Sequence, residues 1–258
     1  MSNELEHDYG SEVHILDDSY LSSGLARLCS PDCRHPELNY WVSRLYTSLL
    51  QHAVNSVFER ESLEIPTRMH TTHPEAILKT SIPKRKSKIV VACLARAGIL
   101  PSHVCFDELN HFFEPEGIRQ DHILLNRRTD TEERVTGADV RGSKIGGDIQ
   151  DAYLLIPDPM GATGSTILST LEQYKSLGTP RAIITMHLII TPEYLQKMRS
   201  AHPSVKIFSL RLDRGLSTKR ALSQRPGSLW SEEKGLNEKH YIVPGGGGLG
   251  EILNNAFI

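Results

Sequence analysis

Five short runs dense in isoleucine, leucine and valine constrain the fold of this chain more than any other feature of its sequence. They alternate little between apolar and polar residues, which is typical of strands that are buried on both faces. The runs cover residues 89–94, 123–125, 153–156, 183–190 and 205–212. Strands of this kind form a parallel sheet between two layers of helices. The sequence therefore predicts an α/β fold with a mostly parallel central sheet.

Helical patterns precede these runs and separate several of them. Apolar residues recur on one face of a helix that starts after Pro36: Leu38, Trp41, Val42, Leu45 and Leu49. This amino-terminal helical arm is expected to run on through Val57. Another helix is expected after Thr166 and should end near Gly178, and a third should begin at Pro192. The alternation of strands and helices predicts helices that flank the sheet.

The chain of 258 residues is expected to form a single domain with additions. Residues 1–20 are polar and acidic and are predicted to be a flexible arm, so that the domain covers residues 21–258. Residues 217–234 are polar and are interpreted as an insertion. Residues 129–151 contain four glycines and are long for a loop, and loops of that length are usually functional or mobile. This loop is expected to close over the site and exclude water.

Composition and charge exclude several classes of function. The formal net charge is −2, so no surface for nucleic acid is expected. No apolar run approaches the roughly 20 residues of a membrane-spanning helix. The first residues lack the basic and apolar segments of a signal peptide. Four cysteines do not make a disulfide framework. We therefore expect a cytoplasmic protein without membrane or nucleic-acid partners.

The segment after the third apolar run carries the strongest functional signal. A buried strand leads into an acid, a turn of small residues and the start of a helix: Asp158, Pro159, Met160, Gly161, Ala162, Thr163, Gly164, Ser165 and Thr166. Ligands bind beyond the carboxyl ends of parallel strands, and N–H groups at a helix start favour an anion. Thr163, Ser165 and Thr166 add hydroxyl donors for the same anion, and the carboxylate of Asp158 could bind vicinal hydroxyls. The segment is therefore predicted to bind a ribose phosphate.

Two other interpretations of this segment compete with a ribose phosphate site. A Walker A loop requires a Gly-Lys-Ser/Thr run, which the sequence lacks. An ordinary strand-to-helix turn capped by serine or threonine is the other alternative. The Asp158-Pro159 pair before the turn favours the ribose phosphate site over this alternative.

This segment is similar to the phosphoribosyl pyrophosphate signature of the uracil phosphoribosyltransferases, Asp-Pro-Met-Leu-Ala-Thr-Gly-Gly-Ser. Over residues 158–165, Gly161 and Ser165 depart from it, and both are small. The resemblance extends over most of residues 22–250. It implies a phosphoribosyltransferase-like domain, a loop that cradles the 5-phosphate, and contact of Asp158 with the ribose hydroxyls.

Two arginines also match the family. Arg96, in Arg96-Ala97-Gly98, and Arg127 are placed after consecutive predicted strands. The resemblance implies that they bind the pyrophosphate of the donor and, with Asp158, are the catalytic residues. Mg²⁺ is expected to bind mainly through the pyrophosphate and not at a protein metal site. Two candidate ligand sets are incomplete for a metal: His70 with His73, and Cys29 with Cys33 and His35.

A glycine-rich segment near the C-terminus resembles the uracil-binding loop of the family and is expected to form a small base-binding hood. The base-binding candidates are Tyr241, Ile242, Gly247, Gly248 and Leu249. Gly248 stands where the family has an aspartate, and Glu251-Ile252 replaces an aspartate followed by arginine or lysine. A dinucleotide-binding Gly-x-Gly-x-x-Gly needs a further helix and strand, which the eight residues after Gly250 cannot provide. A flexible tail turn is the other alternative.

The resemblance implies transfer of ribose 5-phosphate from phosphoribosyl pyrophosphate to uracil, giving UMP and pyrophosphate. It also implies a homodimer or a larger homo-oligomer. One alternative is the same donor with another base. A second, of a different class, is a non-catalytic nucleotide-sensing protein on the same fold, because fold alone does not determine function.

Overall fold

An eight-stranded sheet organises the chain in the computed structural model, which describes residues 4–129 and 135–256, without the side chains of 126–129 and 135–138. The strand order is β1-β10-β9-β7-β4-β5-β6, and β8 adds to β9. Every pair is parallel except β5 with β6. The strands are β1 (Val13–Ile15), β4 (Ile89–Ala95), β5 (Ile118–Thr129), β6 (Val135–Lys144), β7 (Tyr153–Pro157), β8 (Met160–Gly161), β9 (Ala182–Ile190) and β10 (Lys206–Leu212).

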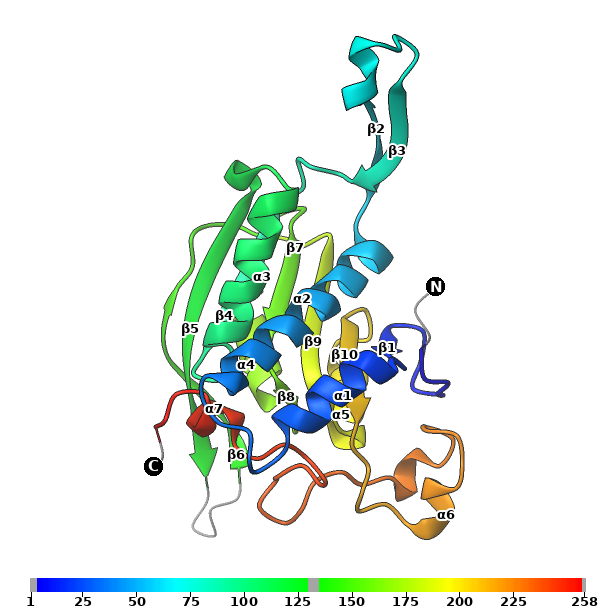
Figure 1. The fold of residues 1–258 in the computed structure, drawn as a ribbon. Helices are drawn as coiled ribbons and strands as arrows, with labels where there is room; N and C mark the ends of the chain where they lie inside the picture. The colour runs from blue at the N-terminus through cyan, green and yellow to red at the C-terminus, as the bar shows by residue number, and fades with distance from the viewer. Residues whose placement is uncertain (1–3, 130–134, 257–258) are drawn as a thin grey trace.

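Helices cover both faces of this sheet, which confirms the predicted α/β fold (Figure 1). One core contains α1 (Ser19–Leu28), α2 (Glu37–Val57) and α3 (Ile99–Phe112), and the other contains α4 (Ser165–Tyr174) and α5 (Pro192–Ala201). Successive residues of one strand point into different cores: Val91 lies in the first, and Val90 and Ala92 lie in the second. Both faces are buried, so the strands read as continuous apolar runs.

The predicted loop of residues 129–151 differs from the structure. Residues 135–144 form β6, which pairs antiparallel with β5 at the edge of the sheet. β5 itself extends from Ile118 to Thr129, well beyond the apolar run of residues 123–125. An edge strand with few apolar side chains satisfies its backbone by pairing with its neighbour, so its sequence reads as a polar loop. Residues 130–134 lie outside the described residues.

A second, two-stranded sheet projects from the body of the molecule (Figure 1). It consists of β2 (Arg60–Pro66) and β3 (Ile77–Pro83), joined through the 3₁₀ turn η1 (Arg68–Thr71). Ile65, Met69 and Leu78 are exposed on this hairpin. The sequence did not predict it, because both strands lie outside the core and lack the apolar density of the central strands.

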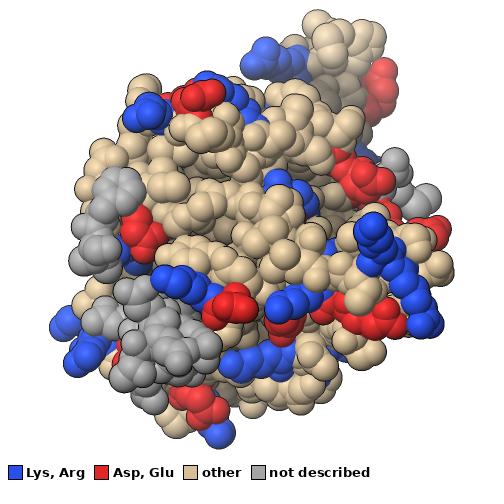
Figure 2. All heavy atoms as spheres, turned by 90° about the horizontal axis from the view of Figure 1, so that it is seen from below, with Lys and Arg blue, Asp and Glu red and all other residues tan. Residues whose placement is uncertain are grey.

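The carboxyl ends of the parallel strands meet at the lower edge of the molecule in Figure 1, and Figure 2 shows the molecule from below. Asp158 follows β7 at this edge, and Arg96 follows β4. The short helix α7 (Leu249–Ile252) lies nearby. Basic and acidic side chains are interspersed over this face. No helix among the described residues is long and apolar enough to cross a membrane.

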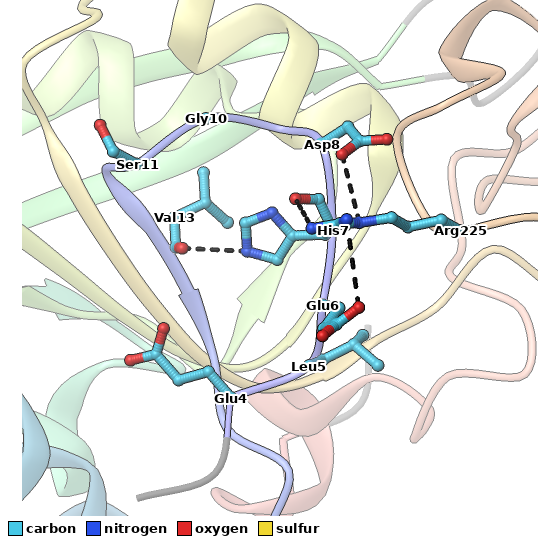
Figure 3. Close-up of a pocket in the computed structure, with 9 residues that line it drawn as sticks. All are labelled: Glu4, Leu5, Glu6, His7, Asp8, Gly10, Ser11, Val13 and Arg225. Atoms are coloured by element: carbon cyan, nitrogen blue, oxygen red, sulfur yellow. Dashed lines mark hydrogen bonds and ion pairs between the residues drawn. The ribbon is translucent and has the colours of Figure 1, made fainter. Parts of the chain in front are cut away.

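The amino-terminal segment differs from the predicted flexible arm. β1 pairs in parallel with β10 at one edge of the sheet, and α1 already begins at Ser19. Tyr9 is only 2% exposed. The segment and Arg225 line an open hollow, where Arg225 Nε lies 3.2 Å from Asp8 Oδ1 (Figure 3). Burial of apolar side chains in a short strand therefore orders residues that look polar overall, although residues 1–3 lie outside the described residues.

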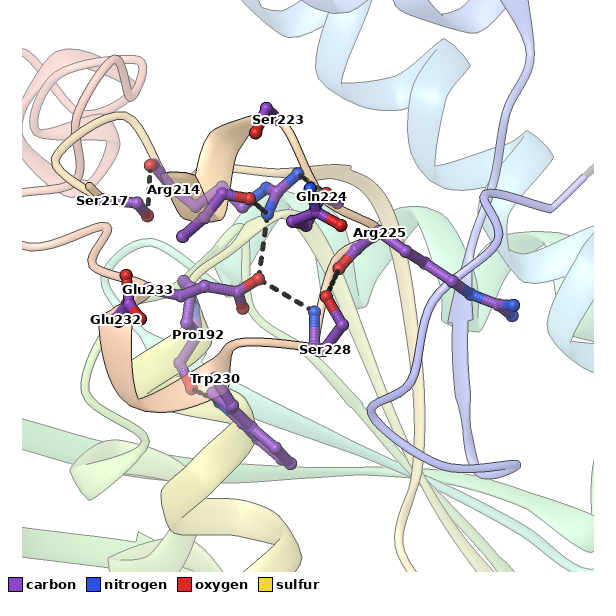
Figure 4. A network of polar contacts seen from close by, with 12 residues as sticks. Pro192, Arg214, Ser217, Ser223, Gln224, Arg225, Ser228, Trp230, Glu232 and Glu233 are labelled. Carbon is purple, nitrogen blue, oxygen red and sulfur yellow. Dashed lines mark hydrogen bonds and ion pairs between the residues drawn. The ribbon is translucent and has the colours of Figure 1, made fainter. Parts of the chain in front are cut away.

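The insertion predicted at residues 217–234 is an ordered lobe that contains α6 (Lys219–Leu222) and the 3₁₀ turn η3 (Trp230–Glu232). A further 3₁₀ turn, η2 (Pro115–Gly117), lies elsewhere and precedes β5. The centre of the lobe is the carboxylate of Glu233, which is fully buried (Figure 4). This carboxylate accepts hydrogen bonds from Arg214 Nη1 (2.9 Å), the Gly227 N–H (2.9 Å) and the Tyr9 hydroxyl. The lobe is thereby fastened to the amino-terminal segment.

We predict that Glu233→Ala lowers the free energy of unfolding by about 3 kcal/mol, because the partly buried Arg214 and the buried Tyr9 lose their charged partner. Glu232→Ala is the matched control: its side chain is 30% exposed and pairs with Arg220 at 3.4 Å, so the loss should stay below about 1 kcal/mol. Urea denaturation of both variants measures the difference. Equal losses would contradict the assignment of Glu233 as the anchor of the lobe.

Candidate functional site

The turn after β7 lies against β9 and is held there by its own backbone. The Asp158 N–H donates to the carbonyl of Met186 at 3.0 Å. The Pro159 carbonyl accepts from the N–H groups of Leu188 (2.9 Å) and Ile189 (3.2 Å). β8 then continues the pairing with β9. The position of the turn is therefore set by main-chain hydrogen bonds, and its outer side stays available for a ligand.

Two glycines of this turn exclude a side chain for different reasons. A Cβ at Gly161 would lie 2.8 Å from Ile190 Cγ2 and 3.3 Å from atoms of the His187 and Tyr194 rings. Gly164 has φ +77°, in the left-handed region that favours glycine. Gly164 therefore allows the sharp turn, and Gly161 allows the chain to lie directly on β9 with Ile190 in its present position.

The first turn of α4 is arranged to receive an anion. Gly164 is the N-cap and provides no side-chain hydrogen bond, and no acidic residue lies in the first turn. The Thr163 hydroxyl and the Lys197 ammonium both donate to Ser165 Oγ, at 3.2 Å and 2.8 Å. The N–H groups of a helix start carry partial positive charge. The structure thus gathers hydroxyls, amides and one ammonium around the start of α4, and Thr166 follows in the same turn.

A buried polar pair, His187 and Tyr194, supports the turn from beneath. His187 Nδ1 lies 2.5 Å from the Asp158 carbonyl oxygen, which can only accept, so Nδ1 carries the proton. Nε2 then accepts from the Tyr194 hydroxyl at 2.7 Å. Burial lowers the pKa of His187 to about 4, because the charged imidazolium would lose its hydration. A neutral imidazole therefore holds the peptide that carries Asp158.

Sequence reasoning missed this pair. His187 lies inside the apolar run of residues 183–190, and Tyr194 lies on the apolar side of a helix, so both read as core residues. Their contact with the turn depends on the pairing of β9 with β8, which is a long-range feature. A lone histidine in an apolar strand is the one signal that a sequence could offer.

Arg96 lies in the turn between β4 and α3, at the same edge of the sheet. Its Nη1 donates to the carbonyl of Ala256 at 3.0 Å, and its Nη2 lies 4.0 Å from Glu251 Oε1. A Cβ at Gly250 would lie 3.5 Å from Ala97 Cβ. The structure therefore places the arginine turn in contact with the predicted hood.

Arg127 differs from the prediction that it follows the end of a strand. β5 continues to Thr129, and the backbone of Arg127 lies opposite Ala138 of β6. Pairing with β6 extends β5 past its apolar part, which the sequence could not indicate. The side chain of Arg127 lies outside the described residues.

The glycine-rich segment is fixed at its start by the ion pair of a buried aspartate with a partly exposed arginine. Asp213, which is buried, binds Arg211 Nε at 2.7 Å and accepts from the Gly245 N–H at 2.7 Å. Arg211 Nη2 in turn donates to the Gly245 carbonyl at 2.8 Å. Both the N–H and the C=O of Gly245 are therefore hydrogen-bonded, and they anchor the start of the segment. This favours an ordered loop over a flexible tail.

The predicted base-binding residues differ in their exposure. Ile242 and Leu249 are buried, whereas the side chain of Tyr241 is 51% exposed. Gly247 has φ +79°. Such a segment offers main-chain N–H and C=O groups, together with apolar contact from the two buried side chains.

Glu251 occupies the space that a side chain at position 248 would fill. A Cβ at Gly248 would lie 2.4 Å from Glu251 Oε2, about the distance between Cβ and a carboxylate oxygen within one aspartate. The side chain of Glu251 is 27% exposed and faces Arg96. A carboxylate thus remains at this place in the molecule although position 248 is a glycine.

Among the described side chains, no group of three or more His, Cys, Asp or Glu residues is placed to hold a metal ion. Asp158 is partly buried at the end of β7.

Comparisons with known proteins agree with this geometry. The family model described as uracil phosphoribosyltransferase matches residues 15–228. The uracil phosphoribosyltransferase of Mycoplasmoides gallisepticum is 28% identical over 209 residues, which cover 80% of this chain and 81% of that protein. The one of Thermococcus sibiricus is 32% identical over 104 residues, so the match spans 40% of this chain and about a third, 35%, of that relative's length.

A solved structure resembles most of the chain. The AQ2163 protein from Aquifex aeolicus superposes with a TM-score of 0.70 and 20% identity. The match covers 93% of this chain and 97% of the other. At this identity, the likeness is one of fold.

We predict that the buried His187 makes the protein less stable as the pH falls from about 6.5 to about 4. In this window the unfolded chain binds a proton at residue 187 and the folded chain does not, so the free energy of unfolding rises with pH. The contribution is about 3 kcal/mol over the window, at about 1.4 kcal/mol per pH unit.

Urea denaturation between pH 4 and 7 measures this slope. His187→Asn should lose this part of the slope, whereas His70→Asn, at an exposed position, should keep it. A wild-type slope retained by His187→Asn would show that other groups cause it.

Proposed function

The chain belongs to the uracil phosphoribosyltransferase family, and from this premise we propose that it transfers ribose 5-phosphate from phosphoribosyl pyrophosphate to uracil. The products are UMP and pyrophosphate. The turn after β7 carries the proposal. There the carboxylate of Asp158 stands directly before a turn of small residues at the positive end of α4. An anion beside vicinal hydroxyls is the chemistry of a ribose phosphate.

The proposed reaction replaces one bond to the anomeric carbon by another. The bond to the pyrophosphate oxygen breaks and leaves its electron pair on pyrophosphate, while N1 of uracil bonds to the carbon and loses its proton. The protein must then position the base and stabilise the leaving group. We assign the 5-phosphate to Thr163, Gly164, Ser165 and Thr166, and the ribose hydroxyls to Asp158. Pro159, Met160, Gly161 and Ala162 shape the turn.

Arg96 and Arg127 are the proposed pyrophosphate ligands. The Arg96 guanidinium lies at the edge where the strands end, and its contact with the Ala256 carbonyl is one that phosphate oxygens would outcompete. Mg²⁺ would neutralise charge on the pyrophosphate. It would be held mainly by phosphate oxygens, which are ligands that suit this ion.

The base is assigned to the glycine-rich segment. Backbone groups of Ile242, Gly247 and Leu249 would match the carbonyl and N–H groups of uracil, and Tyr241 and Gly248 would flank them. The support is the anchoring of Gly245 by Asp213 and Arg211, because a loop held in place loses little entropy when it binds.

We further assign to Glu251 the acidic group that the family sequence carries at position 248. Its Oε2 lies where an aspartate oxygen of residue 248 would lie, and its other oxygen faces Arg96. This placement favours an active enzyme over a chain that has lost an acidic group.

We predict that Glu251→Ala lowers kcat/KM for uracil at least about tenfold, which is about 1.4 kcal/mol of transition-state stabilisation. The double variant Gly248→Asp/Glu251→Ala should recover most of this loss, because it returns a carboxylate to nearly the same place. Gly248 has φ −82°, so aspartate fits its backbone. Steady-state kinetics measure both variants. An unchanged kcat/KM in Glu251→Ala would show that Glu251 is not part of the site.

A homodimer or larger homo-oligomer is part of the proposal. Its support is the β2–β3 hairpin, which projects from the body of the molecule (Figure 1). Ile65, Met69 and Leu78 of this hairpin are exposed. Exposed apolar groups on a projecting element are typical of an association surface. Sedimentation of the full chain as a monomer at micromolar concentration would contradict this part.

The rival proposals keep the same turn for the ribose phosphate and differ in the acceptor or in turnover. Another base would require the glycine-rich segment to present a different set of groups, and the family match ends at residue 228, before this segment. A nucleotide sensor would bind the donor or a nucleotide without turnover.

We place the protein in the cytoplasm, in keeping with four free cysteines.

Calorimetry with phosphoribosyl pyrophosphate and magnesium, together with pyrophosphate release assays on a panel of bases, tests the proposal. Donor binding with release in the presence of uracil supports it. Release with another base alone would change the acceptor, and binding without any release would favour the sensor. No uptake of the donor or of UMP would overturn the proposed site itself.

A further inference from the structure

Lys197 brings an ammonium group to the start of α4 from a neighbouring helix. It lies on α5, is exposed to solvent, and its Nζ lies 2.8 Å from Ser165 Oγ. The stem of the side chain passes over the glycine at the helix start: a Cβ at Gly164 would lie 3.7 Å from Lys197 Cδ. The same Cβ would lie 3.5 Å from Tyr194 Cδ2 and 3.6 Å from Met198 Cγ. One face of α5 therefore surrounds the start of α4.

The contacts beneath the turn fix this approach. Thr191 caps α5 and its hydroxyl donates to the Ala162 carbonyl at 2.7 Å, while Tyr194 binds His187. Lys197 follows Tyr194 by three residues, which places both on one side of the helix. The contacts that hold the turn therefore also hold the part of α5 from which the lysine extends.

The electrostatics of this position call for a negative partner. The amino end of α4 is positive, and a cation is normally favoured at the other end of a helix. The first turn of α4 contains no acidic residue, and no ion pair among the described side chains involves Lys197. In the described structure this exposed ammonium contacts a hydroxyl, which is a weaker partner than an anion. An anion at this place would be attracted by both.

We propose that Lys197 is a ligand of the 5-phosphate in the donor and in the nucleotide product. Its ammonium moves from Ser165 Oγ to a phosphate oxygen and adds a full positive charge to the amides and hydroxyls of the turn. The inference rests on the proposed function, since that function places a phosphomonoester here. It assigns to α5 a part in recognising any ligand that carries this group, and none in recognising the base.

Lys197→Met tests the assignment, because it keeps the stem and removes the charge. Calorimetry should show at least about tenfold weaker binding of UMP and of phosphoribosyl pyrophosphate with magnesium, the size expected for one charged hydrogen bond. In kinetics, KM for the donor should rise by a similar factor while KM for uracil stays unchanged. Lys197→Arg should retain most of the affinity.

Lys175→Met is the matched control. Lys175 lies just past the other end of α4 and pairs with Glu172 at 3.3 Å, so its loss should leave all affinities unchanged. High salt should reduce the difference between wild type and Lys197→Met, since the contact is exposed.

The outcomes separate this inference from the proposed function. If the wild type binds donor and UMP and Lys197→Met binds them equally well, the inference is overturned and the function stands. If the wild type binds neither, the proposed function fails, and the inference fails with it. A rise in KM for uracil equal to that for the donor would also overturn the inference, because it would indicate a general disturbance of the site.

Discussion

The main-chain pairing of residues 158–161 with β9 is the contact on which the site depends. Pro159 and Gly161 continue the sheet for a few residues beyond the end of β7, and this leaves α4 to start at a defined height above its edge. Because the bonds come from the backbone, they hold the turn without using its side chains. The same pairing places His187 and Tyr194 beneath the turn and α5 beside it. One set of main-chain hydrogen bonds therefore positions the turn, the buried pair under it and the neighbouring helix.

The sequence predicted those parts of the fold that are dense in apolar residues. The central strands, the long helix α2 and the turn after β7 were recognisable because burial on two faces, helical periodicity and a run of small residues leave local patterns. β6 and the β2–β3 hairpin lie at an edge or outside the core, so pairing and not apolar content defines them. β1 is buried, but it has only three residues, Val13–Ile15, which are too few to leave a clear pattern. Such strands cannot be predicted well from the pattern of side chains along the sequence.

The candidate site shows the same division. Asp158 and the glycines of the turn could be identified from neighbours in the sequence. His187 was hidden in an apolar run, and its role depends on a carbonyl that lies 29 residues away. Glu251 is a second case: the sequence shows an acid lost at position 248, whereas the structure shows a carboxylate at the same place in space. Sequence comparison aligns positions along the chain, whereas a ligand binds atoms that can come from different positions.

The anchoring of the amino-terminal segment by Glu233 has a consequence for the order in which the molecule is completed. Tyr9 and Glu233 are separated by 224 residues, and β1 lies beside β10, near the other end of the chain. During synthesis the first residues must therefore wait until nearly all the others have left the ribosome. Contacts of such long range form late and slowly. Until then, β1 and its apolar residues stay exposed on the nascent protein, where chaperones or a proteolytic enzyme could reach them.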